Sequence, residues 1–474
     1  MENIQKDQNK ILFFTSFTEF GERYSYYVIQ ALLIFFLLDK FHIDQAKSSS
    51  LVGTALGMIY ISAIVGGYIA DKLIGHYRAA FIGSILMVMG SFILTLSNTQ
   101  NLLFIGLAFI SISTGLIKSN MSSFLGDFYD KSKLSNSHRD FGFNIFYVGI
   151  NFGSLFALFF ASLLKDHFGF KAPFYSSVFI TILMFLTLSV GFLKLKKYIS
   201  HENKTKNAYL KTLLVILAYS FLVFITLKNP QIANATIFIA VLLCAFILIK
   251  SSQKKYWKNV GIATTFFILS ILYWSIYFQQ YISFLVFLDK SVSHNFLGLN
   301  VGSSQFLAIE SLSVVIMGSV MGKIWLYFGK IGKPIQDIDK FNLGFIIIGI
   351  MFAVLYAGTL LGNPSSKFPP IIIALSLMIL SISELSLSAI GLSMITKNAP
   401  KGYVSLYMGI WLVTLGIGGK LAGFFSSSIS ITDDVATSKI NMGHGFLLFL
   451  GLAILGSILC LIARNKIIKF SSIN

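Results

Sequence analysis

The sequence predicts an all-α polytopic membrane protein with fourteen transmembrane helices. Of its 474 residues, 55% are hydrophobic and only 12% are charged, and the mean hydropathy is +0.77. A water-soluble globule is excluded, because such a chain carries about twice this charged fraction. The apolar residues fall into fourteen blocks separated by short polar stretches, and each block is long enough for a helix that crosses a bilayer.

The first apolar block, residues 11–38, lacks the small-residue cleavage site of a signal peptide, so we expect it to stay in the protein as a membrane helix. At about 20 to 25 residues for each span, the blocks use most of the chain and leave no room for a soluble domain. The other blocks are residues 48–70, 79–96, 101–125, 141–164, 172–193, 209–227, 231–249, 259–288, 300–328, 341–362, 369–396, 402–428 and 441–463.

The distribution of positive charge predicts the orientation in the membrane. Most of the 37 Lys and Arg residues lie in alternate loops, and the positive-inside rule places these loops and both termini in the cytoplasm. The formal net charge of +18 is spread over many short loops, which argues against binding of nucleic acid.

The blocks divide as six, two and six. We therefore predict an N-terminal six-helix bundle at residues 1–197, a linker with a two-helix hairpin at 198–257, and a C-terminal six-helix bundle at 258–474. Transporters of the major facilitator fold are built in this way, with the substrate site at the midplane between the halves. Topology alone also permits a channel or a membrane-embedded enzyme with a similar number of helices.

Motifs for enzymatic chemistry are missing from the sequence. It has no H-E-x-x-H, G-x-S-x-G or G-x-x-x-x-G-K-[ST] pattern, so we expect neither an enzyme nor an ATP-driven mechanism. The two cysteines, Cys244 and Cys460, lie in separate apolar blocks and form neither a C-x-x-C motif nor a disulfide framework. We therefore predict no metal and no cofactor.

Polar residues inside the first block form one stripe. Their spacing of three or four residues puts them on one face of a helix, and ionisable groups within a membrane usually face a water-filled cavity or one another. The stripe has two carboxylates but only one guanidinium, so the protonation of one carboxylate can change with its neighbours. The alternative is a buried ion pair that only holds two helices together. The stripe consists of Glu19, Glu22, Arg23, Tyr26, Tyr27 and Gln30.

Three further candidates for a functional role are charged residues within other blocks: Lys118 in the fourth, Glu310 in the tenth and Glu384 in the twelfth. Lys118 lies too deep for its ammonium to extend to the membrane surface, so we expect it to pair with the carboxylates of the first helix. Basic and acidic groups in one half and acidic groups in the other suit a small dipolar substrate. Its carboxylate would lie near Arg23 and Lys118, and its ammonium near Glu384.

Other residues of the spans have structural explanations beside functional ones. The glycine pairs Gly53 and Gly57, and Gly149 and Gly153, have the spacing that lets two helices approach closely. Aromatic residues are candidates for the walls of a substrate site, although core packing explains most of them. The aromatic candidates are Tyr60, Trp274 and Trp411.

Residues 19–27 read EFGERYSYY and resemble the E-x-x-E-R-F-x-Y-Y motif of the proton-dependent oligopeptide transporters, a family of the major facilitator superfamily. Further matches follow in order along almost the whole chain, and the hairpin at 209–249 resembles that of the fourteen-helix bacterial members. The further matches are GGYIAD at 66–71, GLIKSN at 115–120, FYVGINFGS at 146–154, SELSLSAIG at 383–391 and YMGIW at 407–411.

The resemblance implies a symporter that imports di- and tripeptides with protons by alternating access. It implies that proton coupling involves Glu19, Glu22, Arg23 and Lys118, and that Lys118 also contacts the peptide carboxylate. It also implies that Glu384 binds the peptide amino group. The remaining substrate-binding residues implied by the resemblance are Tyr26, Tyr27, Tyr60, Asn151, Trp274, Ser388 and Trp411.

The sequence departs from the family pattern at several positions. The family has an outer gate pair of an arginine and an acidic residue, and the two places hold Gln30 and Phe278 here, so no unpaired charge remains. A proline after the motif lysine is replaced by Ser119. The Asn-Pro of a later helix is replaced by Glu310-Ser311, and Glu310 is a candidate to share the substrate ammonium with Glu384. The alternative for Glu310 is a neutral side chain hydrogen-bonded to a neighbouring helix.

We therefore predict a monomeric, multi-pass transporter in the inner (plasma) membrane of a bacterium. Its partners would be small peptides, protons and the lipid bilayer, and nucleic acid would not be among them. One alternative is a family relative that imports another small zwitterionic or peptide-like metabolite. From a different class, the alternative is a passive channel.

Overall fold

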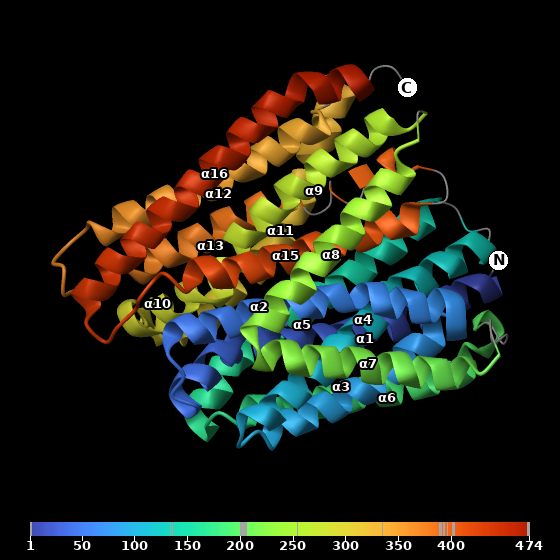
Figure 1. Ribbon diagram of the computed structural model, residues 1–474, viewed down its shortest axis with the longest axis horizontal. Helices are drawn as coiled ribbons and strands as arrows, with labels where there is room; N and C mark the ends of the chain where they lie inside the picture. The colour runs from blue at the N-terminus through green and yellow to red at the C-terminus, as the bar shows by residue number, and fades with distance from the viewer. Residues whose placement is uncertain are drawn as a thin grey trace. The chain divides into compact units, whose positions relative to one another are not determined.

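The computed structural model is almost entirely helical, as Figure 1 shows. It describes residues 2–471 except 133, 135, 200–205, 254, 334, 388–390, 392, 393, 396, 401 and 402. Within this described part, the strands are β1 (Asn295–Phe296) and β2 (Leu299–Asn300), which form a short antiparallel hairpin. The predicted all-α class is therefore confirmed.

Turn residues separate the helices where the backbone must reverse. Gly75 and Gly169 have positive φ angles of 84° and 80°, a conformation that costs glycine little. Proline occupies the first turn of α6, α8 and α13, where its missing N–H is not needed. The helices up to the linker are α1 (Glu2–Phe35), α2 (Gln45–Ile69), α3 (His76–Thr95), α4 (Gln100–Ser132), α5 (Asn136–Phe168) and α6 (Ala172–Lys194).

The remaining helices begin at Ala208. Along the whole chain, short irregular turns adjoin some helices: π turns at Phe36–Lys40 and Ala70–Ile74, and 3-10 turns at Lys196–Tyr198 and Phe278–Tyr281. The helices are α7 (Ala208–Lys228), α8 (Pro230–Ser251), α9 (Trp257–Tyr277), α10 (Ser283–Ser291), α11 (Ser303–Lys330), α12 (Asp337–Thr359), α13 (Pro370–Leu385), α15 (Val404–Ser426) and α16 (Val435–Ser471).

Twelve helical segments of the described chain are long and apolar enough to cross a membrane. Helix α1 is not among them, because Glu19, Glu22 and Arg23 interrupt its apolar residues. Helix α13 is shorter, with 16 residues. The prediction of a multi-pass membrane protein is confirmed, and the count of fourteen spans stays a prediction.

The chain divides into two compact units. Unit 1 comprises Met1–Phe36 and Met58–Ala233, and unit 2 comprises Leu37–Gly57 and Asn234–Asn474. Helix α2 is thus divided: its first half packs within unit 2 and its second half within unit 1. The predicted domain boundaries at 197 and 258 stay predictions.

In unit 1, α1 is the central helix. It packs against α4, α5 and α6, and α7 packs against α4. A Cβ atom on Gly149 would lie 2.6 Å from the carbonyl oxygen of Ser16, and one on Gly153 would lie 2.5 Å from that of Phe20. Only glycine permits this approach of α5 to α1, as the spacing of the pair predicted. Gly153 of α5 therefore lies beside the polar stripe of α1, since a Cβ atom there would be 2.9 Å from the Cβ atom of Arg23.

In unit 2, α9 packs against α15 and α16, while α11 and α12 both pack against α13. The first half of α2 lies against α15, since a Cβ atom on Gly53 would be 2.7 Å from the Cα atom of Gly423. One at Gly57 would be 3.1 Å from the carbonyl oxygen of Gly416. Both glycine pairs predicted to allow close packing of helices are therefore confirmed in that role.

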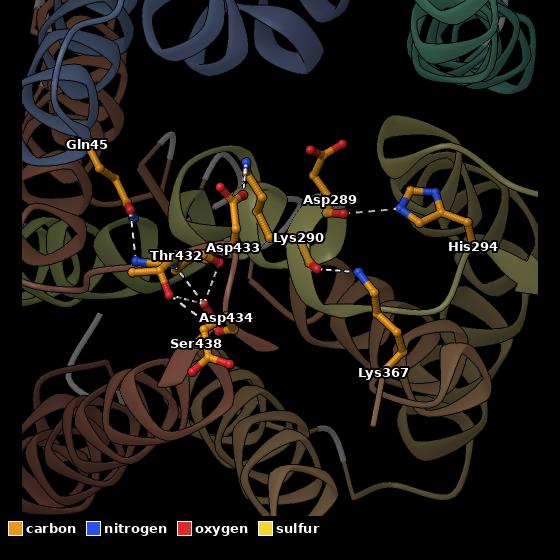
Figure 2. A network of polar contacts seen from close by, with 10 residues as sticks. Gln45, Asp289, Lys290, His294, Lys367, Thr432, Asp433, Asp434 and Ser438 are labelled. Carbon is orange, nitrogen blue, oxygen red and sulfur yellow. Dashed lines mark hydrogen bonds and ion pairs between the residues drawn. The ribbon is translucent and has the colours of Figure 1, made fainter. Parts of the chain in front are cut away.

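A polar network joins the connecting segments of unit 2 (Figure 2). The side-chain amide of Gln45 donates to the carbonyl of Ile429 at 2.8 Å and accepts from the amide of Ile431 at 2.8 Å. This pair of bonds fixes the start of α2 to the segment before α16. Nearby, Lys290 donates to Asp433, and this bond together with the lysine charge holds the pKa of the Asp433 carboxyl below its ordinary value.

Candidate functional site

A buried ion pair lies within the polar stripe of α1. Arg23 binds Glu22 through two nitrogens: Nη2 donates to Oε1 at 2.6 Å, and Nε donates to Oε2. The two side chains expose only 4% and 0% of their surface. Two charge-assisted hydrogen bonds help to offset the cost of removing both ions from water. The guanidinium carbon also lies 4.5 Å from the centre of the Tyr26 ring.

Glu19 lies one helical turn before this pair and is buried. Neither of its carboxyl oxygens has a hydrogen-bond partner among the described residues. It is close enough to Glu22, Arg23 and Lys118 for their charges to act on it. A buried carboxylate without hydrogen bonds is costly, whereas a protonated carboxyl costs less. The α1 cluster, our name for Glu19, Glu22, Arg23, Tyr26, Tyr60 and Lys118, therefore holds one paired and one unpaired carboxyl.

Lys118 comes from α4 and meets the aromatic side of the α1 cluster. Its Nζ atom lies 4.8 Å from the centre of the Tyr60 ring, and the Tyr60 hydroxyl accepts a hydrogen bond from that of Tyr26 at 3.2 Å. Lys118 is only partly buried, so its ammonium remains accessible. The charge of Lys118 thus acts on Glu19 of the α1 stripe, and its pairing with the carboxylates of that stripe stays a prediction.

Three other predicted residues of unit 1 lie on α1 and α5. Tyr27 is partly exposed, and its ring meets that of Tyr26 edge-on with 5.1 Å between the centres. Asn151 on α5 is buried and donates to the carbonyl of Tyr147 in its own helix at 2.9 Å. Gln30 is buried near the end of α1, and its side-chain oxygen has no partner within the described chain.

In unit 2, one tyrosine hydroxyl joins two glutamates. The Tyr277 oxygen on α9 lies 3.1 Å from Oε1 of Glu310 on α11 and 3.2 Å from Oε2 of Glu384 on α13. Glu310 exposes 3% of its surface, whereas Glu384 is partly exposed. Within the described part of the chain, Glu310 is paired with no lysine or arginine. We call Tyr277, Glu310 and Glu384 the acidic cluster.

Aromatic side chains surround the acidic cluster. Trp274 is buried, with ring centres 4.9 Å from Tyr277 and 5.5 Å from Phe278, and its indole N–H has no partner among the residues described. Trp411 is buried against Gly391, where a Cβ atom would lie 2.0 Å from the indole ring. Trp274 therefore has a polar group to offer, whereas Trp411 is held by packing. The predicted Ser388 lies outside the described residues.

Two residues were missed by the sequence analysis. Tyr277 lies three residues after Trp274, on the same face of α9, and this helical spacing was the signal that could have found it. Lys420 is a lysine within α15 whose Nζ donates to Thr54 at 2.8 Å. A lysine inside a span is such a signal by itself. In the described chain, no group of three or more His, Cys, Asp or Glu residues could hold a metal ion.

Comparison with known proteins now identifies the family. The family model described as PTR2, POT family, matches residues 77–442. This chain belongs to the POT family. The resemblance that residues 19–27 indicated is therefore confirmed. The family match begins after these residues, so it does not depend on them. As members of this family are transporters, the prediction that the protein is not an enzyme is confirmed as well.

Individual relatives of this POT-family chain match it over nearly its full length. It is 27% identical over 446 residues to dipeptide and tripeptide permease B of Photorhabdus asymbiotica, covering 91% of this chain and 90% of the relative. It is 26% identical to the di-/tripeptide transporter of Lactococcus lactis, covering 91% and 93%. A crystal structure of a POT family transporter in complex with 5-aminolevulinic acid has the same fold, with a TM-score of 0.82, 25% identity and 96% of each chain covered.

Proposed function

We propose that this protein imports di- and tripeptides together with protons, by alternating between outward-open and inward-open states. The α1 cluster carries the proposal. This cluster combines the buried ion pair of Glu22 and Arg23 with Glu19, a buried carboxyl that lacks a hydrogen-bond partner among the described residues. The chain that contains it belongs to a family of transporters. The names of the permeases from Photorhabdus asymbiotica and Lactococcus lactis support peptides as the substrate class.

Proton coupling in this proposal begins at Glu19 and Glu22. When Glu22 binds Arg23, the guanidinium is neutralised and a substrate carboxylate gains little from it. A proton on Glu22 would weaken the pair and release Arg23, and together with Lys118 it would then attract the carboxylate. Glu19 is the nearest buried carboxyl from which such a proton could pass. The proton and the peptide thus bind best together, as symport requires.

The peptide amino group would be bound in unit 2. Glu384 is the partly exposed carboxyl of the acidic cluster, so it can contact an ammonium, whereas the buried Glu310 supports it from behind. We propose that Tyr26, Tyr27, Tyr60, Asn151, Trp274, Ser388 and Trp411 line the site.

The membrane arrangement forms part of the same proposal. We infer fourteen transmembrane helices, arranged as a six-helix bundle in residues 1–197, a hairpin in 198–257 and a second six-helix bundle in 258–474. The excess of Lys and Arg in alternate loops supports cytoplasmic termini. Bacterial relatives support a bacterial plasma membrane. We propose that one chain suffices for transport, since both clusters are formed within it.

Uptake of labelled dialanine by proteoliposomes with an imposed proton gradient, acidic outside, tests the function. The purified protein should concentrate dialanine above its external level, and a protonophore should abolish the excess. Equilibration without accumulation would indicate a passive channel. Liposomes without protein and liposomes with an Arg23→Ala variant are the controls.

A second candidate function is import of another small zwitterion. It is favoured by the complex of a similar transporter with 5-aminolevulinic acid, and by Gln30 and Phe278 at the places of the usual gate pair. Competition distinguishes the two. If 5-aminolevulinate inhibits uptake at lower concentration than dialanine and is itself accumulated, the peptide assignment is wrong.

A further inference from the structure

The acidic cluster has more hydrogen-bond acceptors than a single phenol can serve. The Tyr277 oxygen lies 3.1 Å from one carboxyl and 3.2 Å from the other, but a phenol has only one hydrogen to donate. Its oxygen can, however, accept a second hydrogen bond. Both contacts are good hydrogen bonds only if one of the two carboxyls carries a proton and donates it to the tyrosine oxygen.

The charges of the acidic cluster also indicate one proton for the two carboxyls of Glu310 and Glu384. Glu310 and Glu384 contact the same hydroxyl and therefore lie close together, and two neighbouring carboxylates, one of them buried, do not ionise together easily. The titratable groups that face Glu310 in the described structure are Tyr273 and Tyr277 on α9 and Glu384 on α13. From α10, Asp289 contacts only the start of α11, about two helical turns away. None of these groups supplies a positive charge.

We propose that Glu310 and Glu384 share one proton through Tyr277, and that this proton is released when the ammonium group of a substrate binds Glu384. The inference rests on the proposed function, because it takes a substrate with an ammonium group. Glu384 contacts the ammonium, and Glu310 acts on the ammonium only through Glu384. Glu310 is therefore a positioning residue. In this exchange one carboxyl O–H bond breaks and its proton passes to water at the exposed side of Glu384. A hydrogen bond then forms from the substrate ammonium to the Glu384 carboxylate.

Exchange of a proton for an ammonium keeps the charge of the acidic cluster constant. Without substrate, two carboxyls and one proton carry a single negative charge. With the ammonium bound and the proton gone, the net charge of the group is the same. In a buried region of low dielectric constant, constant charge avoids a large change in solvation energy during binding.

Proton counting by isothermal titration calorimetry tests the exchange. Dialanine is titrated into the purified protein at pH 6.5, where its amino group is charged, in buffers that differ in ionisation enthalpy. The wild-type protein should release more protons per dialanine than Glu310→Gln, by up to about one. The variant should still bind dialanine, because its amide can donate to Tyr277 as the protonated carboxyl does. Equal proton release from both proteins would overturn the proposal.

Infrared spectroscopy supplies a second measurement that needs no substrate. The wild-type spectrum should contain a C=O band of a protonated carboxyl that is lost as pH rises and is absent from Glu310→Gln. The Glu19→Gln variant, which removes a buried carboxyl of unit 1, should retain this band. If the band of the wild type persists in Glu310→Gln, the proton is elsewhere and the proposal is wrong.

The two measurements separate this proposal from the proposed function. A wild-type protein that shows the Glu310-dependent band but binds no dialanine would contradict the peptide assignment and leave the shared proton in place. A protein that accumulates dialanine but lacks the band would contradict the shared proton alone. Glu310→Gln must run as a single monodisperse species in size-exclusion chromatography, and Tyr277→Phe, which keeps both carboxyls, should shift the band without removing it.

Discussion

The α1 cluster of unit 1 and the acidic cluster of unit 2 bury carboxyl groups in different ways. Glu22 is neutralised by Arg23 through two hydrogen bonds, so a permanent cation balances its charge. Glu310 has no such cation among the described residues, and its contacts are with Tyr277 and Glu384. The difference shows that a buried acid can be accommodated either by a fixed counter-charge or by a proton. The second solution requires a proton in the resting cluster, whereas the ion pair of Glu22 and Arg23 requires none until a proton displaces the guanidinium.

The largest expected effect comes from breaking the ion pair of the α1 cluster. Glu22→Gln should abolish accumulation of dialanine driven by a proton gradient, because Arg23 is then released regardless of protonation. Exchange of labelled for unlabelled dialanine across the membrane should remain measurable. Removing one partner of a buried pair costs about 3–5 kcal/mol of stability, so the melting temperature of the variant must be measured as well. Normal accumulation would mean that the pair is only structural.

Loss of Lys118 should also remove active uptake, with a smaller effect on folding. Lys118 is partly exposed and lies over the Tyr60 ring, so Lys118→Ala leaves no fully buried ion unpaired. Lys118→Arg is the matched variant, and we expect little rescue, because a planar guanidinium does not replace a compact ammonium. If the alanine variant still concentrates dialanine in proteoliposomes, coupling does not involve Lys118.

Changing the acidic cluster at Glu384 should affect affinity more than coupling. Glu384→Gln replaces a charged partner of the substrate ammonium with a neutral one. Hydrogen bonds to charged groups contribute about 1.5–3 kcal/mol, which corresponds to roughly a 10- to 150-fold rise in Kd for dialanine. Calorimetry measures this change. An equal loss of affinity in Glu384→Gln and Glu22→Gln, with coupling intact in both, would remove the contrast between the clusters.

The smallest effect is expected outside both clusters, at Asp433. Lys290 lowers the pKa of this carboxyl, so the bond stabilises the fold above the ordinary Asp pKa of 3.8, and the stabilisation is lost as pH falls through the lowered value. Asp433→Asn should therefore reduce the melting temperature slightly at neutral pH and not in strong acid. Lys290→Gln should give the same small loss, and the double variant should add nothing. A loss that persists in acid would contradict this origin.

The sequence predicted the fold better than the details of either cluster. Composition and the spacing of apolar blocks were sufficient for an all-α membrane chain, because these patterns depend only on local burial in lipid. Glu22, Arg23 and Lys118 could be predicted as site residues because a charge within an apolar block is visible in the sequence alone. Tyr277 was not found, since a buried tyrosine is common, and its importance comes from contacts with residues on two other helices. The split of α2 between the units depends on tertiary packing that no local pattern encodes.

That split of α2 bears on whether the two halves of the polypeptide could exist as separate fragments. A cut at Asn229, between α7 and α8, would leave Leu37–Gly57 on the N-terminal fragment, although these residues pack within unit 2. Each fragment made alone would then expose surfaces that the full chain covers at Gly53 and Gly423. Fragments produced together should recover a complementary surface and associate. The first half of α2 would thus act as the recognition element of a split transporter.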